Sequence, residues 1–363
     1  MQHDVESPGK LFGLALLILL LALVAGAGLR IAAVIPKKTI THDEGISYLA
    51  ATGHQGDYAR LSSGVFPHGQ WVGGADWKRF LAIEDPLPLR RIGSDLANFD
   101  IHPPLYFWAL HLWSLLFGVS LWAGLSLNIL ISLLAVLAVF SLARYVLQGA
   151  REGALAALLW AVSPAVLQVT AGEARPYELL ALCTVLFASQ FFRSTDIAQQ
   201  PRWRHHLFLA AATAAGLLTH YHFAIVVAGC VGWACWRLVR RHRRRLVVSL
   251  ASVAAGCVLF LVLHPHFWRA FLRAEAQAQD FQWSRLLYRA LRSGGTLSGF
   301  MTNAGAGRLA MLLGLLGIGA LVLMGFLRGR RHPPAKHNAR RDRLLQVVFL
   351  LVWIYGLITA LYL

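Results

Sequence analysis

The sequence is poor in charged residues and in cysteine. Only 14% of its 363 residues are Asp, Glu, Lys or Arg, whereas 57% are hydrophobic and the mean hydropathy is +0.56. About a quarter of the residues in a typical soluble domain are charged, so an ordinary soluble fold is excluded. The four cysteines all lie inside apolar segments and match no zinc-binding spacing. They are therefore interpreted as small packing residues and not as a disulfide framework or a metal site.

Repeated apolar segments predict an all-α polytopic membrane protein. A helix needs about 20 residues to cross the hydrocarbon layer, and the sequence holds about nine candidate spans, several of them shorter than this. The first could alternatively be a signal peptide over residues 11–28, but its apolar character continues past that range. The predicted spans cover residues 11–35, 123–147, 154–171, 177–192, 206–218, 221–239, 246–263, 309–327 and 344–363.

The basic residues predict how these spans are oriented. The formal charge is +17, and 18 of the 34 Lys and Arg fall in four short loops at 144–151, 193–205, 237–245 and 328–343. A cytoplasmic N-terminus places all four loops in the cytoplasm, as the positive-inside rule requires. A further apolar segment at 103–118 would reverse this arrangement if it crossed, so we expect it to lie at the outer face. The basic excess is thus topological, and no nucleic-acid partner is expected.

We interpret the whole chain, residues 1–363, as one transmembrane domain with two large outer loops. The loop at 36–101 contains eight of the 17 acids and is expected to form an ordered, partly helical cap. The loop at 264–307 alternates aromatic residues with arginines, which is typical of amphipathic helices at a membrane surface. The chain stops within the apolar segment "LITALYL", which favours a missing C-terminal portion.

Polar and ionisable residues that could take part in binding or catalysis gather in five segments that the topology places on the outer face. Ionisable residues at the membrane are candidates for function, although each segment also has a purely structural interpretation. "THDE" at 41–44 fits a helix capping box, prolines suit helix starts, and histidines are common interfacial polar groups. The segments are "THDE" (41–44), "DIHPPLYF" (100–107), "GEARPYELL" (172–180), "THYH" (219–222) and "HPHF" (264–267).

These residue types suit glycosyl transfer from a lipid-phosphate donor. The leaving phosphate needs cationic or hydrogen-bonding partners at the bilayer edge, and the attacking hydroxyl needs a carboxylate base. Successive helical residues point about 100° apart, so Asp43 and Glu44 cannot do the same job. Asp43 is the candidate base, while Glu44 suits the cap. The candidate phosphate partners are His102, Arg175, His220, His222, His266 and Arg269.

The acidic pair after the first span, "D-x-H-P-P-L-Y" and "E-A-R-P-Y" together resemble the GT-C fold glycosyltransferases. The similarity is to the protein O-mannosyltransferase and lipid A aminoarabinose transferase type, and runs over roughly residues 10–239. It implies a polyprenyl-phosphate-linked sugar donor, an extracytoplasmic active site and transfer with inversion. The implied roles are catalysis by Asp43 with support from Glu44, and donor binding by His102, Pro103, Glu173, Arg175 and Tyr177, with Glu178 as a less clear second carboxylate.

Several points remain open from the sequence. The long central loop domain of eukaryotic protein O-mannosyltransferases is absent, which favours a bacterial enzyme of the inner membrane. The acceptor hydroxyl could belong to a glycan, a lipid or a protein. No cofactor is firmly expected, although a divalent metal ion beside His42, Asp43 and Glu44 is an alternative. Two other functions also fit: a transporter or flippase of an anionic glycan lipid, and a non-catalytic subunit of a glycan assembly pathway.

Overall fold

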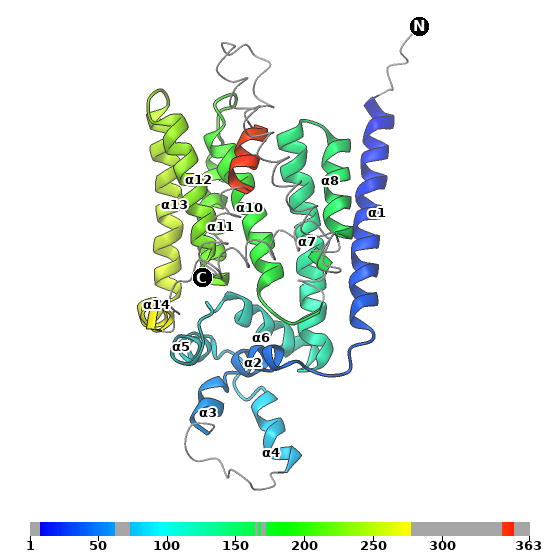
Figure 1. Ribbon diagram of the computed structural model, residues 1–363, viewed down its shortest axis with the longest axis vertical. Helices are drawn as coiled ribbons and strands as arrows, with labels where there is room; N and C mark the ends of the chain where they lie inside the picture. The colour runs from blue at the N-terminus through cyan, green and yellow to red at the C-terminus, as the bar shows by residue number, and fades with distance from the viewer. Residues whose placement is uncertain (1–7, 62–72, 164–165, 168–171, 277–342, 352–363) are drawn as a thin grey trace, which may run out of the picture.

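The computed structural model describes residues 8–61, 73–163, 166–167, 172–276 and 343–351. These residues form helices joined by turns and contain no strand, which confirms the all-α prediction. Long helices stand side by side as a bundle, and a cap of short helices covers one end of it (Figure 1).

Seven helices from α1 to α13 form most of the bundle, and consecutive ones run in opposite directions, while the helical residues 343–351 pack among them (Figure 1). Of these, α1, α7 and α13 are long and apolar enough to cross a membrane. Together with the composition, they identify an integral membrane protein. The bundle helices are α1 (Pro8–Val34), α7 (Leu121–Leu147), α8 (Ala150–Val162), α10 (Tyr177–Thr195), α11 (Trp203–Thr219), α12 (Phe223–Leu238) and α13 (Arg243–Leu263).

Several predicted span boundaries differ from the structure by three or more residues, and two of them have a clear cause. Helix α8 ends at Val162, because Ser163 precedes a proline and takes an extended conformation with ψ 121°. Helix α13 begins at Arg243 and not at residue 246, since long arginine side chains can extend a helix beyond the apolar layer. The predicted span at 309–327 lies outside the described residues. The span at 344–363 is described as helical up to residue 351.

The bundle has one basic end and one capped end. The turns between α7 and α8, α10 and α11, and α12 and α13 carry three of the four predicted basic loops and lie together at the end opposite the cap (Figure 1). The fourth, at 328–343, lies outside the described residues except for Arg343. Helix α6 (Leu105–Phe117) lies among the cap helices, packed against α2 and the capped end of α7. The apolar segment at 103–118 therefore remains on one side of the bundle, as the charge pattern predicted.

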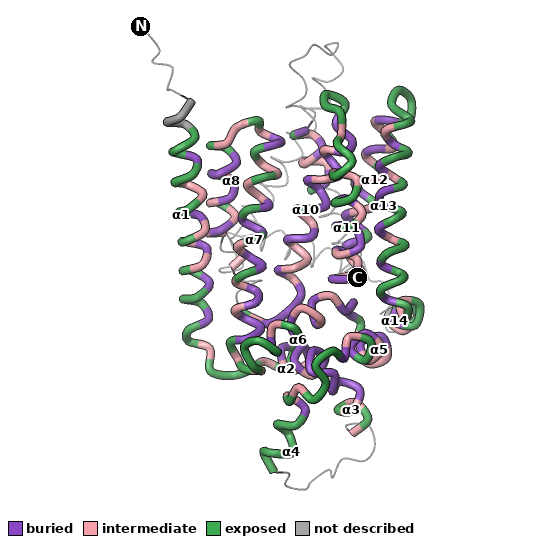
Figure 2. Tube along the Cα trace, turned by 180° about the vertical axis from the view of Figure 1, so that it is seen from behind, coloured by how far each residue is buried: buried purple, intermediate pink, exposed green. Residues whose placement is uncertain are grey.

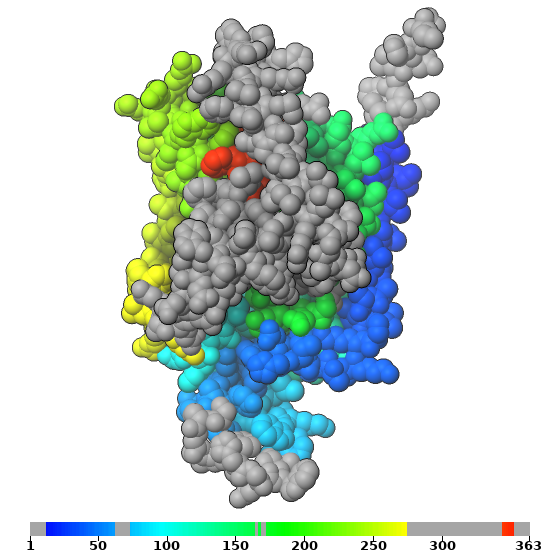
Figure 3. Space-filling view, viewed as in Figure 1, coloured from blue at the N-terminus to red at the C-terminus, as the bar shows by residue number. Residues whose placement is uncertain are grey.

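The cap projects beyond the bundle, as Figure 3 shows in blue and cyan. Its apolar centre contains the fully buried Tyr48, Ile92, Leu96, Tyr106 and Phe107, which join the cap to α7. The amphipathic helix α14 (Phe267–Ala276) packs against α5. The other cap elements are α2 (His42–Ala51), α3 (Gln55–Arg60), α4 (Gly74–Lys78), the 3-10 turn η2 (Arg79–Leu81) and α5 (Leu89–Phe99).

Burial follows the pattern of a membrane bundle. Figure 2 shows that α1 and α13 at the two sides are largely exposed, whereas α10 and α11 between them are more buried. Apolar side chains such as Leu17, Val24 and Val262 lie on these exposed faces. Such surfaces are compatible with lipid, in which exposed apolar side chains carry no hydration cost.

Candidate functional site at the capped end

The site begins at the first turn of α2, where Glu44 closes a capping box. The Thr41 hydroxyl accepts a hydrogen bond from the Glu44 backbone N–H at 3.4 Å, and Glu44 Oε2 accepts one from the Thr41 N–H at 2.9 Å. The pattern "T-H-D-E" therefore starts this helix as its residue types predict, because each side chain satisfies a backbone donor that the helix leaves open.

Glu44 also joins three distant pieces of chain. Its side chain is fully buried, and Oε2 lies 2.7 Å from Lys37 Nζ at the end of α1. Oε1 accepts a hydrogen bond at 3.0 Å from the backbone N–H of Ala174, in the turn before α10. Lys37 also donates to the carbonyl of Gly172 in this turn. Glu44 therefore fixes the turn at 172–175 relative to α1 and α2.

Asp43 points away from this clamp and is 51% exposed. Its Oδ2 lies 3.8 Å from the guanidinium of Arg175, which also donates to the backbone carbonyl of Asp43 at 3.3 Å. Arg175 itself is buried, with only 8% of its surface accessible. The two adjacent acids thus have different environments: one is a buried clamp, and the other is an accessible carboxylate beside a buried cation.

The turn that presents Arg175 is shaped by close packing on α7. The side chain of Asn128 donates to the carbonyl of Glu173 at 2.8 Å, and the Tyr48 hydroxyl accepts from the Gly124 N–H at 2.8 Å. A Cβ atom at Gly124 would come within 2.4 Å of the Ala174 Cβ, so only glycine permits this approach. Pro176 then caps α10 and ends the turn.

Three histidines extend the site away from Asp43. The rings of His102 and His220 are 5.6 Å apart, and those of His220 and His222 stack at 4.7 Å. His102 Nδ1 lies 2.6 Å from Asp100 Oδ1, and Gln55 donates to the other oxygen of this carboxylate at 3.2 Å. The tight turn between α11 and α12, predicted from "THYH", therefore brings its histidines against the start of α6.

The electrostatics of this histidine group follow from burial. Burial lowers the pKa of His220 to about 3, and the nearby His222, His102 and Arg175 act in the same direction. His220 Nδ1 accepts a hydrogen bond from the His222 N–H at 3.2 Å, which leaves the proton of the neutral ring on Nε2. Burial alone would raise the pKa of Asp100, but the hydrogen bond and charge of His102 outweigh it and lower that pKa.

The remaining candidates lie at the same end of the bundle. Pro103 is buried directly before α6, and Tyr177 begins α10 with its ring 6.3 Å from that of His220. His266 follows His264, which contacts the Tyr221 hydroxyl at 2.9 Å and whose pKa burial lowers to about 4. Arg269 instead donates to Asn98 of α5 at 3.1 Å.

Glu178 is buried inside the bundle. Its Oε1 lies 3.5 Å from Arg30 of α1, and both side chains are almost completely inaccessible. Arg30 further donates to the carbonyl of Ala161 at 3.1 Å. This pair holds α1, α8 and α10 together and lies apart from the exposed Asp43, which suits a structural role better than that of a second catalytic carboxylate.

The sequence interpretation missed two residues that position the site. Lys37 neutralises Glu44, and Asn128 holds the turn at 172–175 from the middle of an apolar helix. A lone asparagine within a predicted span was an available signal, since polar groups inside a membrane need a partner. No comparable signal distinguished Lys37 from the adjacent Lys38, because the path of the chain between α1 and α2 decides which lysine meets Glu44.

The described residues contain no group of three or more His, Cys, Asp or Glu side chains close enough to hold a metal ion. At the alternative metal position suggested by sequence, Glu44 is directed into its clamp, whereas His42 is 88% exposed beside Asp43. Glu44 thus points away from the neighbouring His42 and Asp43, so the three side chains do not form one coordination site.

No curated protein matches the chain. A family match does cover His102, Arg175, His220 and His222, while Asp43 and Glu44 precede it. That match, over residues 101–268, is to the dolichyl-phosphate-mannose-protein mannosyltransferase family, a GT-C type family, and it confirms the resemblance of this membrane protein to such glycosyltransferases.

Proposed function

We propose that the protein transfers a sugar from a polyprenyl-phosphate donor to an acceptor hydroxyl, with Asp43 as the general base. The observation that carries this proposal is the pairing of an accessible carboxylate with a buried guanidinium at the capped end of a membrane bundle. The family match supports a mannosyltransferase-like reaction. A donor with a long apolar tail would place its phosphate near this end, where the bundle meets the cap.

Arg175 and the histidines are proposed to bind the donor phosphate. A guanidinium in a buried environment attracts a phosphate more strongly than one in water, and its fork-shaped donors match phosphate oxygens. Since the lowered pKa keeps His220 neutral, this ring would contribute the Nε2–H as a hydrogen-bond donor and not a second positive charge. His102 lies against the same ring. The phosphate site would therefore depend on Arg175 for its charge.

The proposed chemical step moves one proton and one sugar. The acceptor oxygen attacks the anomeric carbon while its proton passes to Asp43, and the bond between that carbon and the phosphate oxygen breaks. The bonding electrons leave with the phosphate, whose negative charge Arg175 and the histidines stabilise. Attack opposite to the leaving group inverts the anomeric centre. Asp43 lies beside Arg175, and His220, on a different segment, is near enough for the charge of Arg175 to lower its pKa. This arrangement suits a base and a phosphate site on opposite faces of a sugar.

Glu44 is proposed to position these groups without exchanging protons with substrate. Its carboxylate is enclosed by Lys37, Thr41 and Ala174. Through Ala174 it fixes the neighbouring Arg175, and through the first turn of α2 it fixes Asp43. The resemblance to the family implied a supporting role for Glu44, and we propose that this support is structural.

We further propose that the capped end faces away from the cytoplasm. The basic turns lie at the opposite end of the bundle, and the positive-inside rule assigns them to the cytoplasm. In a bacterium this arrangement places the cap in the periplasm and the bundle in the inner membrane.

The test is sugar transfer by the purified protein in nanodiscs, with radiolabelled polyprenyl-phosphate mannose and related lipid-linked sugars as donors and a cell-envelope extract as acceptor. We expect Asp43→Asn to abolish transfer while donor binding persists. Asp76→Asn, an exposed acid of α4, is the matched control and should be fully active. Transfer that survives Asp43→Asn would refute the assignment of the base. Donor that crosses the membrane without any transfer would favour a transporter.

A further inference from the structure

A polar cavity lies in the cap, away from the bundle. It has a volume of about 520 Å³, within the usual range for a small-molecule site, and it opens between α3 and η2. The residues that matter here are His54, Asp57, Arg60, Arg79, Phe80 and Glu84, all of which line it.

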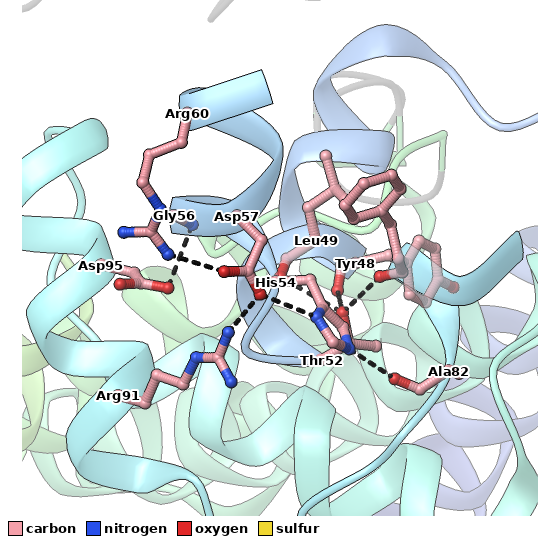
Figure 4. Close-up of polar contacts among 11 residues, drawn as sticks. Tyr48, Leu49, Thr52, His54, Gly56, Asp57, Arg60, Ala82, Arg91 and Asp95 are labelled. Atoms are coloured by element: carbon pink, nitrogen blue, oxygen red, sulfur yellow. Dashed lines mark hydrogen bonds and ion pairs between the residues drawn. The ribbon is translucent and has the colours of Figure 1, made fainter. Parts of the chain in front are cut away.

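The cavity wall is held by an organised polar network. Figure 4 shows Asp57 of α3 between Arg60, which donates to it at 2.6 Å, His54 at 3.3 Å, and Arg91 of α5. The other ring nitrogen of His54 contacts the carbonyl of Ala82, beyond η2, at 3.2 Å. These contacts tie both sides of the cavity together, so its shape is largely set before any ligand binds.

The charges that line the cavity balance. Asp57 and Glu84 are negative and Arg60 and Arg79 are positive, so these four side chains contribute no net charge. A site for phosphate or another anion would be expected to carry an excess of positive charge. Paired carboxylates and guanidiniums instead suit neighbouring hydroxyl groups, since a hydroxyl donates to one and accepts from the other.

An aromatic group continues from the cavity to the surface. The ring of Phe80 lies 5.8 Å from that of Tyr58 and 6.3 Å from that of Trp77. Tyr58 is 38% exposed and Trp77 is 41% exposed. The helices that carry them, α3 and α4, lie at the far side of the cap from the bundle (Figure 1). Exposed rings beside paired polar groups offer an apolar surface to the C–H face of a sugar and hydrogen bonds to its edge.

Neighbouring residues and hydrogen bonds link the cavity wall to both parts of the proposed active site, the helix that carries Asp43 and the histidine group. It lies next to the C-terminal end of α2, whose first turn carries Asp43; ten helical residues span about 15 Å. Thr52, directly after α2, donates to the carbonyl of Phe80 at 2.8 Å. Gln55, next to His54 in the chain, donates to Asp100, the partner of His102. A ligand longer than one sugar ring could thus lie in the cavity and direct one end toward Asp43.

We propose that this cap cavity binds the acceptor, and that the acceptor is a neutral carbohydrate chain. This inference rests on the proposed function, because it is the transfer reaction that requires an acceptor. Glu84 and Arg79 bind hydroxyl groups of the chain, and the aromatic group of Tyr58, Trp77 and Phe80 contacts its rings. The end hydroxyl is presented to Asp43, while the lipid-linked donor occupies the Arg175 side.

The test measures carbohydrate binding directly and does not need transfer. The probe is mannotetraose, titrated calorimetrically into protein in zwitterionic nanodiscs. We expect Arg79→Gln and Glu84→Gln each to weaken binding about tenfold, the effect of one charge-assisted hydrogen bond. Both residues are exposed and stand apart from the proposed catalytic residues, so the fold should persist. Arg90→Gln, an exposed arginine of α5 outside the cavity lining, is the matched control and should bind as the wild type.

The outcomes separate the two proposals. Binding that weakens in the two cavity variants but not in Arg90→Gln or Asp43→Asn supports the acceptor site. The same pattern in a protein without transfer activity overturns the proposed function alone and leaves a carbohydrate site. No saturable binding, equal binding by all variants, or binding of a serine-rich peptide in place of mannotetraose overturns the cavity proposal. In an active enzyme, the cavity variants should raise the acceptor KM about tenfold and leave kcat unchanged.

Discussion

The two adjacent acids of α2 should respond in opposite ways to loss of charge. In Glu44→Gln, the amide keeps one oxygen as an acceptor, and its NH2 group replaces the other. In one orientation the NH2 group faces Lys37 and the Thr41 N–H, and in the other it faces the Ala174 N–H, so a donor meets a donor in both. The buried ammonium of Lys37 also loses its partner. Breaking one side of a buried ion pair costs about 3 to 5 kcal/mol, and Lys37 keeps some water contact. We therefore expect Glu44→Gln to lower the free energy of unfolding by about 3 kcal/mol.

Asp43→Asn should leave stability almost unchanged. Its carboxylate is half exposed, and its 3.8 Å contact with Arg175 is too long for a strong ion pair. Pairs of this kind contribute about 0 to 1 kcal/mol, so we expect a change of no more than about 0.5 kcal/mol. In transfer assays Asp43→Asn should be inactive. Glu44→Gln should retain a small fraction of the activity, because its base is present but Arg175 is poorly placed.

The assay is unfolding in mixed micelles with increasing SDS, followed by tryptophan fluorescence. Glu152→Gln is the matched control, since this exposed acid also stands in the first turn of a helix; it should cost about 0.5 kcal/mol. The double variant Lys37→Gln/Glu44→Gln should be less destabilised than the sum of its single variants, because no unpaired charge remains. Equal stability of Glu44→Gln and wild type, or equal destabilisation by the two acid variants, would refute the clamp.

Three further predictions concern stability. The pKa of His220 is about 3 in the folded protein and near 6.5 in the unfolded chain, so its contribution to the free energy of unfolding is complete above about pH 7 and declines as the pH falls. SDS unfolding at pH 4.5 should show a free energy of unfolding lower by about 2 to 3 kcal/mol, and His220→Asn should reduce this loss. Arg30→Met alone should lower the free energy of unfolding by about 3 to 5 kcal/mol, whereas the double variant Arg30→Met/Glu178→Leu should recover most of this loss. A double variant as unstable as Arg30→Met would contradict the pairing. Gly216→Ala should destabilise the protein, because a Cβ there would lie 2.3 Å from a ring carbon of Phe223, while Gly232→Ala, with open space around it, should not; similar melting temperatures would contradict this packing.

Local patterns in the sequence were sufficient for most of the described helices and for which of their turns share one end of the bundle. Long apolar runs predict spans because a bilayer leaves the backbone no other partner than itself. The basic turns predicted which connections share one end, and the structure places them together opposite the cap. The capping box at Thr41 and Glu44 could likewise be predicted from the sequence, since both partners lie within one helical turn. Boundaries were less certain where a proline or an arginine cluster altered a helix end.

The site itself depended on contacts that no local pattern encodes. Glu44 and Ala174 are 130 positions apart, and Asp43 and Arg175 are 132 apart. Their meeting requires the packing of α2, α7 and α10 around Gly124. The neutral state of His220 is also a tertiary effect, because burial and neighbouring positive groups lower its pKa. The sequence alone thus determined a helical membrane protein with the acids and histidines of the candidate site at one end. Only the tertiary structure decided which acid is a clamp and which is accessible, because burial and long-range partners arise from packing and not from residue type.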